Sequence, residues 1–293
     1  MSLSPLHPNT GFWAIKSELK RCPSVGQKWD HLLGHGDVPQ WIPADFLSPG
    51  DYVHIPVHQG YERPITSEQA WMYGLYLAED STLLDGGVTG KHNRITLTMN
   101  ERELPMLERF ATVFAETFGK VPRVFYRQRQ GVTSELVVSP GRDICLQFRT
   151  LFGHRAEGKR LPDWMFDMEA DLKKALLQGW IDGDGHVSKV GTVSATTISA
   201  RLAYQLFQIA LEAGERPSMA KLKAGGRRKR DSYTIHITNG QESTVVDGEL
   251  FYRVHARYRD QKIVDVVGLD VSGEHTYVVN GVGVHTSVGD HGE

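Results

Sequence analysis

The spacing of apolar residues predicts a middle section of helices and strands. After Ser67, a residue type that caps helices, apolar positions recur at helical spacing from Ala70 to Ala78. The segment 167–180 has the same spacing and also leads into acidic residues. Between and after these helices we predict strands 94–99, 121–127 and 133–138 with helices 101–118 and 141–152, then strands 187–195, 218–222 and 232–238 with a helix at 199–213.

The order of these elements repeats, which indicates an α+β chain with two copies of one unit. Each copy opens with an acid-ended helix, and we predict the order αββαββα for both, over 61–165 and 166–245. The ends differ from this middle. Residues 1–60 are irregular, with a Pro-Gly-Asp turn feeding a strand, and 246–293 are rich in strand-forming residues. We therefore predict a central domain with β-rich flanks.

Two nine-residue segments repeat one pattern, 72–80 (MYGLYLAED) and 177–185 (LQGWIDGDG). The third and seventh residues of both are glycine or alanine, and residues four apart share one helix face. Small residues at this spacing allow two helix backbones to approach closely. Glycine inside a helix costs about 1 kcal/mol relative to alanine. Close packing of these two helices is the simplest compensation.

Four acids lie near the predicted ends of these helices: Glu79, Asp80, Asp182 and Asp184. A helix C-terminus carries partial negative charge, so each carboxylate there is disfavoured by ~0.3–1 kcal/mol. A bound Mg²⁺ would remove this cost, because hard cations take oxygen ligands. The alternative is that these are solvated ends of two unrelated helices. The repetition within one chain favours a shared metal site.

Composition limits the classes of protein that fit. The 293 residues have room for two domains, 40% of them are hydrophobic, and the formal net charge is −2. The two cysteines form no CxxC pair, which argues against a thiolate zinc site and fits a reducing compartment. We find no signal peptide and no apolar run that approaches a membrane span. We expect a cytoplasmic protein of prokaryotic or phage origin, without a membrane partner.

A short basic segment predicts contact with nucleic acid. Six of the ten residues in 221–230 are cationic and none is acidic: Lys221, Lys223, Arg227, Arg228, Lys229 and Arg230. A Gly-Gly pair between two predicted strands makes this a hairpin. A cationic two-stranded ribbon fits the major groove and contacts phosphates. The alternative is a solvated charged loop; we favour double-stranded DNA as the partner.

The paired motifs resemble those of the LAGLIDADG homing endonucleases. The resemblance implies two α/β halves joined at the motif helices, in a monomer that hydrolyses DNA phosphodiesters with two or more Mg²⁺ ions. The acids at the eighth place of each motif, Glu79 and Asp184, would bind the metal. The ninth place is usually glycine, and Asp80 departs from that pattern. Lys159 opens a Lys-Arg-Leu-Pro segment that resembles a basic motif of the family, which makes it a candidate catalytic residue; otherwise it is a solvated linker lysine.

The C-terminal segment resembles the last blocks of an intein. The resemblance covers 267–285 and includes His275 and His285. In inteins the penultimate histidine assists cyclisation of a terminal asparagine. Here His285 is followed by Thr286 and Ser287, so the asparagine is missing and cleavage by that route should fail.

The N-terminal end resembles an intein as well. Residues 4–8 contain His7 at the histidine place of an internal Thr-x-x-His block, and 41–56 resemble the strand before an endonuclease insertion. The first block, with its nucleophile, is not found. We expect 1–60 and 246–293 to be parts of a Hint-type β fold around an endonuclease at 61–245.

Three explanations for the flanks remain open: a split intein that pairs with a separate N-terminal fragment, a remnant kept as a free-standing endonuclease, or a trimmed and mutated intein. A DNA-binding LAGLIDADG protein without catalysis is a further alternative. Such relatives usually lose the motif acids, and Glu79 and Asp184 are both present.

Overall fold

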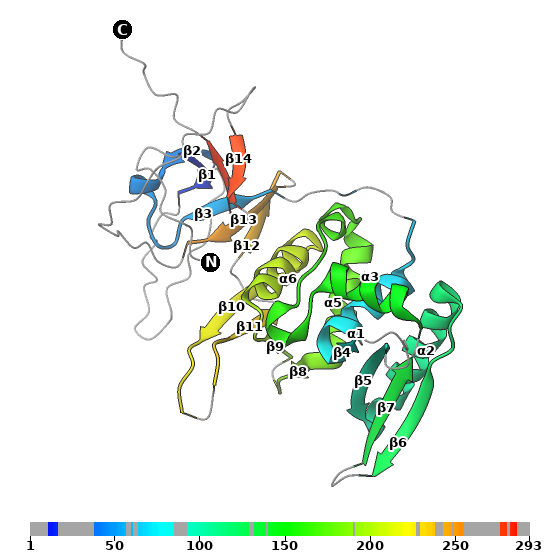
Figure 1. Cartoon of the computed structure of the whole chain (residues 1–293). Helices are drawn as coiled ribbons and strands as arrows, with labels where there is room; N and C mark the ends of the chain where they lie inside the picture. Colours follow the sequence, from blue (N-terminus) through cyan, green and yellow to red (C-terminus); the bar gives the residue numbers. More distant parts are fainter. Residues whose placement is uncertain are drawn as a thin grey trace. The chain divides into compact units, whose positions relative to one another are not determined.

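The computed structural model divides the chain into two compact units, one made of Met1–Val57 with Gly240–Glu293 and the other of His58–Asn239. It describes residues 11–16, 38–56, 60, 64–84, 93–128, 132–138, 140–189, 191–226, 229–237, 243–247, 249–254, 276–279 and 282–285 (Figure 1). Six residues with predicted roles lie outside these ranges: His7, Arg227, Arg228, His275, Thr286 and Ser287.

The first half of the unit His58–Asn239 has the predicted order of elements. Its elements are α1 (Ser67–Glu79), β4 (Asp80–Leu83), β5 (Arg94–Asn100), α2 (Leu104–Phe118), β6 (Arg123–Gln128), β7 (Val132–Val138) and α3 (Arg142–Phe152). The four strands form one antiparallel sheet in the order β4-β5-β7-β6. The chain then passes through the short helix α4 (Arg155–Gly158) and a 3₁₀ turn, Asp163–Asp167.

The second half differs from the prediction at its end. It contains α5 (Ala170–Asp184), β8 (Gly185–Val187), β9 (Val193–Thr197), α6 (Ala200–Glu212), β10 (Pro217–Leu222) and β11 (Ser232–Ile237). Its antiparallel sheet has the order β8-β9-β11-β10. No third helix follows β11 among the described residues, because the next element is the strand β12 (Ser243–Val246). This half therefore reads αββαββ.

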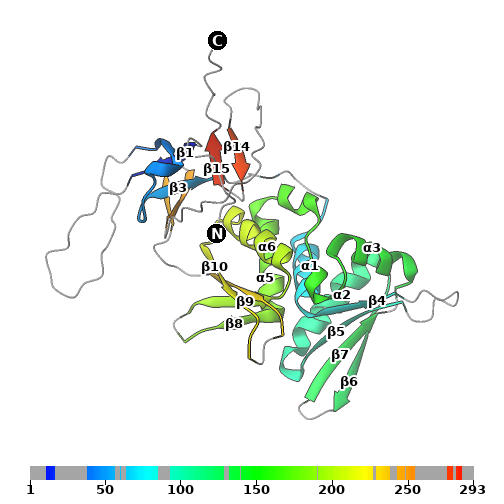
Figure 2. The same cartoon turned by 60° about the vertical axis from the view of Figure 1, so that its left-hand side comes forward.

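Helices α1 and α5 pack side by side between the two four-stranded sheets (Figures 1 and 2). Around α1, Tyr73 and Tyr76 contact the rings of Phe148 and Phe152 from α3. On the α5 side, the fully buried Lys173 pairs with Glu212 of α6 at 2.7 Å. An aromatic core thus supports the first half, and a buried ion pair joins the two helices of the second.

The other unit is a seven-stranded antiparallel sheet. Its strands are β1 (Gly11–Ile15), β2 (Gln40–Pro43), β3 (Tyr52–Ile55), β12, β13 (Glu249–Arg253), β14 (Thr276–Val279) and β15 (Val282–His285). Strands from both ends of the chain pair directly, with Gly11 opposite His285 and Tyr52 opposite Arg253. Ile15, Tyr52 and Phe251 form a buried cluster. In the parts of the chain that the structure describes, no helix has the length and hydropathy needed to span a membrane.

Candidate metal centre

Two glycines bring the backbones of α1 and α5 into contact. A Cβ atom built on Gly74 would lie 2.0 Å from the carbonyl oxygen of Leu176, and one built on Gly179 would lie 2.0 Å from that of Trp71. Both distances are far below any real contact of a Cβ atom. The expected reason for glycine in these helices is therefore confirmed, since only glycine permits this packing.

The same packing brings the two helix ends together. Glu79 is the last residue of α1, and Asp184 is the last residue of α5. A Cβ atom on Gly183 would lie 2.4 Å from the Ala78 Cβ and 3.2 Å from the Glu79 Cγ. The residue before Asp184 therefore touches the residues that end α1, and carboxylates from the two halves meet at one place.

This arrangement raises the pKa values of both carboxyls. Burial raises the pKa of Glu79 to about 7, and the neighbouring Asp184 charge adds to the rise. Burial also raises the pKa of the Asp184 carboxyl to about 6, although the residue as a whole is exposed to solvent. The Lys159 ammonium opposes both shifts. A divalent cation bound between the two carboxyls would favour their ionised forms and offset the burial and repulsion that raise their pKa values.

Lys159 lies at the end of α1 and not in a solvated linker. Its half-buried ammonium donates hydrogen bonds to the carbonyl oxygens of Leu77 at 2.7 Å and Ala78 at 3.2 Å. A cation at these carbonyls stabilises the negative end of the helix. The Ser199 hydroxyl of the second half donates to the Lys159 carbonyl oxygen at 2.7 Å, which fixes the segment that carries the lysine.

The other two acids differ from this pair. Asp182 accepts hydrogen bonds from Trp71 Nε1 at 2.7 Å and from Gln178 Nε2 at 2.6 Å, so it ties α5 to α1. Asp80 is the first residue of β4, opposite Leu97, and not a helix end. Glu79 and Asp184 are thus the two candidates for metal binding.

The donor set fits a hard divalent cation such as Mg²⁺. Among the described residues, no group of three or more His, Cys, Asp or Glu side chains could hold an ion. Two carboxylates with oxygen donors and no thiolate or imidazole are typical of Mg²⁺, which keeps several waters and binds substrate phosphates. Glu79 and Asp184 would supply the protein ligands of such a site.

Part of the predicted basic hairpin is paired with acids. Lys221 lies 3.0 Å from Asp231, and Arg230 lies 2.8 Å from Glu157 of α4. Lys223 and Lys229 are exposed. Lys221 and Arg230 thus form ion pairs within the protein, and the charge of Lys223 also acts on Asp231. Asp231, directly after the basic run, was the sequence signal for the first pair, whereas the second joins residues far apart in the chain.

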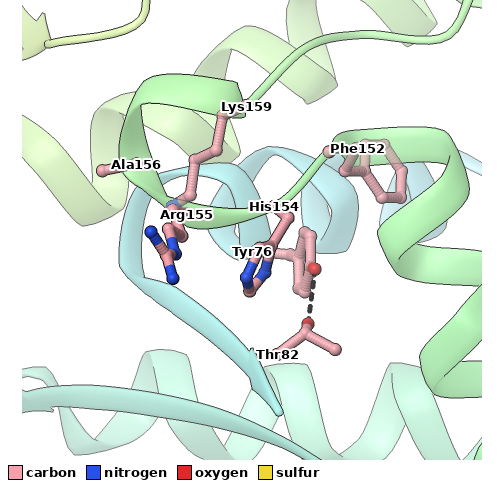
Figure 3. A pocket seen from close by; sticks show the side chains of 8 residues that line it. Tyr76, Thr82, Phe152, His154, Arg155, Ala156 and Lys159 are labelled. Atoms are coloured by element: carbon pink, nitrogen blue, oxygen red, sulfur yellow. Dashed lines mark hydrogen bonds between the residues drawn. The ribbon is translucent and has the colours of Figure 1, made fainter. Parts of the chain in front are cut away.

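A small pocket beside Lys159 was missed by the sequence analysis. Its volume is about 170 Å³, and its lining includes Tyr76, Thr82, His154 and Arg155 (Figure 3). The Tyr76 hydroxyl and the Thr82 hydroxyl share a hydrogen bond of 2.6 Å. No motif marked His154 or Arg155 in the sequence, so only the fold reveals the pocket.

Residues 171–253 match the family model of the LAGLIDADG-like domain. Among curated proteins, the chain is 22% identical over 256 residues to the ATP-dependent DNA helicase Hel308 of Thermococcus kodakarensis, a match to 77% of this chain and 22% of the helicase. It is 27% identical over 155 residues to the replication factor C small subunit of Methanocaldococcus jannaschii, which covers 50% of this chain and 8% of that protein. The chain thus spans less than a quarter of these relatives.

Solved structures of homing endonucleases also match this chain. A mesophilic variant of I-DmoI matches at 13% identity with a TM-score of 0.43, over 59% of this chain and 89% of that one. I-WcaI bound to its DNA recognition sequence matches at 12% identity with a TM-score of 0.39, over 61% and 78%.

Proposed function

We propose that the chain is a site-specific homing endonuclease that hydrolyses both strands of DNA with a divalent metal. The observation that carries the proposal is the meeting of Glu79 and Asp184 at the packed ends of α1 and α5. Each half contributes one carboxylate, so neither half alone has the composite site. The LAGLIDADG-like match at 171–253 supports the same function.

The residues around this site have distinct roles. Glu79 and Asp184 would hold the cation, which when bound polarises the phosphate and makes a water nucleophilic. Lys159 keeps the end of α1 in place through Leu77 and Ala78, and its positive charge favours the approach of a phosphate.

The two halves together suit a long DNA site. Their sheets have corresponding strand orders, β4-β5-β7-β6 and β8-β9-β11-β10, which supports a pseudo-two-fold pair around the composite site. Their side chains differ, so we propose that the two half-sites differ in sequence. Lys221, Lys223, Lys229 and Arg230 of the β10–β11 hairpin are all exposed and would contact phosphates.

We propose further that the endonuclease derives from an intein. Strands from both flanks form one sheet, in which Gly11 of β1 pairs with His285 of β15. The endonuclease unit is thus an insertion between two parts of one β-rich unit. Two matched proteins with different names share a segment that is a minor part of each, which supports a mobile insertion.

The splicing proposal has its own test, because Thr286 stands where the terminal asparagine is expected. Thr286→Asn should restore release of a C-terminal extension, seen as a smaller product on a gel. A separate N-terminal fragment should then be needed for ligation. If Thr286→Asn does not release the extension, the missing asparagine is not the only defect, which would contradict the interpretation as an intein blocked at this one position.

The nuclease proposal is tested with a DNA substrate that represents the insertion site without the insertion. In it, the sequences that flank the coding region on its two sides are joined directly. Purified protein with Mg²⁺ should produce a double-strand break at one position, and EDTA should prevent it. Binding of the same DNA without cleavage in Mg²⁺ or Mn²⁺ would instead identify a DNA-binding protein that has lost catalysis.

A further inference from the structure

The pocket beside the carboxylate site combines an apolar floor with a cationic rim. Rings of Tyr76 and Phe152 line it, and Lys159, which also binds the end of α1, borders it. Tyr76 and Thr82 lie on either side of Glu79 in the chain, at the end of α1 and in β4. Lys159 links the pocket to the composite site, because it lines the pocket and its charge acts on Glu79.

Its rim carries the exposed side chains of His154 and Arg155, and the nearest acid, Glu157, acts on both only through its charge. Figure 3 shows His154 and Arg155 beside Tyr76 and Thr82, with no acid among the residues that line the pocket. Within the described chain, the Arg155 guanidinium makes no hydrogen bond and no ion pair. Glu157, an acid of the same short helix, pairs with Arg230 at 2.8 Å.

The backbone at Arg155 supports a functional reason for this residue. Arg155 has a φ of 59°, in the left-handed region that favours glycine, and Asp247 is the only other non-glycine residue with a positive φ in the described part of the chain. Strain of this kind persists mainly where a side chain serves a function. Burial and the charges of Arg149 and Arg155 lower the pKa of His154 against the opposing charge of Glu157, so Arg155 is the principal cation at this rim.

We propose that this pocket binds a phosphate oxyanion, and that in the DNA complex the ligand is a backbone phosphate next to the one at Glu79 and Asp184. Arg155 would supply the charge-assisted hydrogen bonds, and whichever hydroxyl of the Tyr76–Thr82 pair accepts their shared hydrogen bond would add one donor. A phosphate held in this pocket would fix the position of the DNA strand relative to the two carboxylates. The choice of DNA as the source of the phosphate rests on the proposed nuclease function.

The test combines DNA affinity with stability in Arg155→Gly. Glycine removes the guanidinium and also accepts the left-handed backbone, so the thermal midpoint should stay equal or rise. The dissociation constant for target DNA should increase about 5–10-fold at 0.1 M salt, and the slope of log affinity against log salt should shrink by about 1. Arg155→Lys should keep the wild-type slope, as should Arg142→Ala, an exposed arginine of α3 outside the pocket.

A folded Arg155→Gly protein with the wild-type affinity and salt slope would overturn the proposal. If that variant does not fold, Arg155→Gln takes its place in the same measurement, with the same two outcomes. If the wild-type protein binds no DNA at all, the nuclease proposal fails on its own. The pocket is then tested with inorganic phosphate alone, by ³¹P NMR line broadening: broadening by wild type and not by Arg155→Gly supports the anion site, and equal signals overturn it.

Discussion

Trp71 Nε1 of α1 donates a hydrogen bond of 2.7 Å to Asp182 Oδ2 of α5. This bond gives the two acids of the second motif different roles. Asp182 is used in joining the helices, so Asp184 remains for the metal. The Arg109 guanidinium lies 3.9 Å from the centre of the Trp71 ring and forms two hydrogen bonds with Glu68, which orders the same corner.

Trp71→Phe should therefore destabilise the protein without removing its chemistry. A hydrogen bond to a charged group contributes about 1.5–3 kcal/mol, and phenylalanine keeps most of the buried ring area. We expect a loss of that size in urea unfolding, with cleavage within a few-fold of wild type where the protein is folded. Loss of cleavage at unchanged stability would instead place this bond in the catalytic machinery.

Gly74→Ala tests the close contact of the motif helices. In an ordinary helix this change stabilises by about 1 kcal/mol. Here the methyl group would meet the Leu176 carbonyl, so we expect a loss of about 2–3 kcal/mol or more in the free energy of unfolding. Gly225→Ala is the control, because a Cβ atom there meets nothing within 4 Å. Equal stability of the two variants would disprove the contact.

The buried ion pair of α5 and α6 gives a prediction with a neighbouring control. Lys173→Met leaves the buried Glu212 carboxylate without its cation, which should cost about 3–5 kcal/mol. Lys174 is half exposed and lies 3.8 Å from Asp171, so Lys174→Met should change the stability by less than about 0.5 kcal/mol. Chemical denaturation of both variants at pH 7 makes the comparison. Similar values would show that the pair adds nothing.

The raised pKa of Glu79 predicts how the metal-free protein responds to pH. The folded state holds this proton more tightly than the unfolded state, so the contribution of Glu79 to stability is greatest below pH 4.5 and is lost as the pH rises through about 7. The loss from this group is about 3 kcal/mol. The Asp184 carboxyl changes stability in the same direction, between pH 3.8 and about 6.

Denaturation at pH 5 and pH 8 without divalent ions measures this effect. Glu79→Gln should flatten the profile and be more stable than wild type at pH 8. Mg²⁺ should stabilise the wild-type protein at pH 8 and leave Glu79→Gln nearly unchanged, because the cation binds the ionised carboxylates. A flat wild-type profile would argue against burial of Glu79 at this helix junction.

The sequence predicted the elements that depend on local pattern. Apolar periodicity located α1, α2, α5 and α6, and the spacing of Gly74 and Gly179 predicted that two helices would touch. The repeated acids also pointed to Glu79 and Asp184, whose role as metal ligands stays a prediction. The helices and their close contact could be predicted because helical periodicity and the small size of glycine are both visible in the local sequence.

Contacts between residues far apart in the chain could not be predicted from the local sequence pattern. The bond from Trp71 to Asp182, the pairing of Arg230 with Glu157 and the pocket at Arg155 each join residues that only the folded chain brings together. The third helix predicted for the second half was wrong for the described residues, because the strand β12 follows β11. Its residues pair with β13, and this tertiary pairing cannot be read from a local pattern.

The most direct test of the composite site is single-turnover DNA cleavage by Glu79→Gln and Asp184→Asn, with Asp182→Asn as a matched control two residues away. DNA affinity is measured in parallel without Mg²⁺. We predict that each of the first two variants binds DNA like wild type and loses at least about 10³-fold in cleavage of both strands, equal to about 4 kcal/mol of barrier. Asp182→Asn should stay within a few-fold of wild type. Wild-type cleavage by either Glu79→Gln or Asp184→Asn would contradict a metal site shared between the two helices.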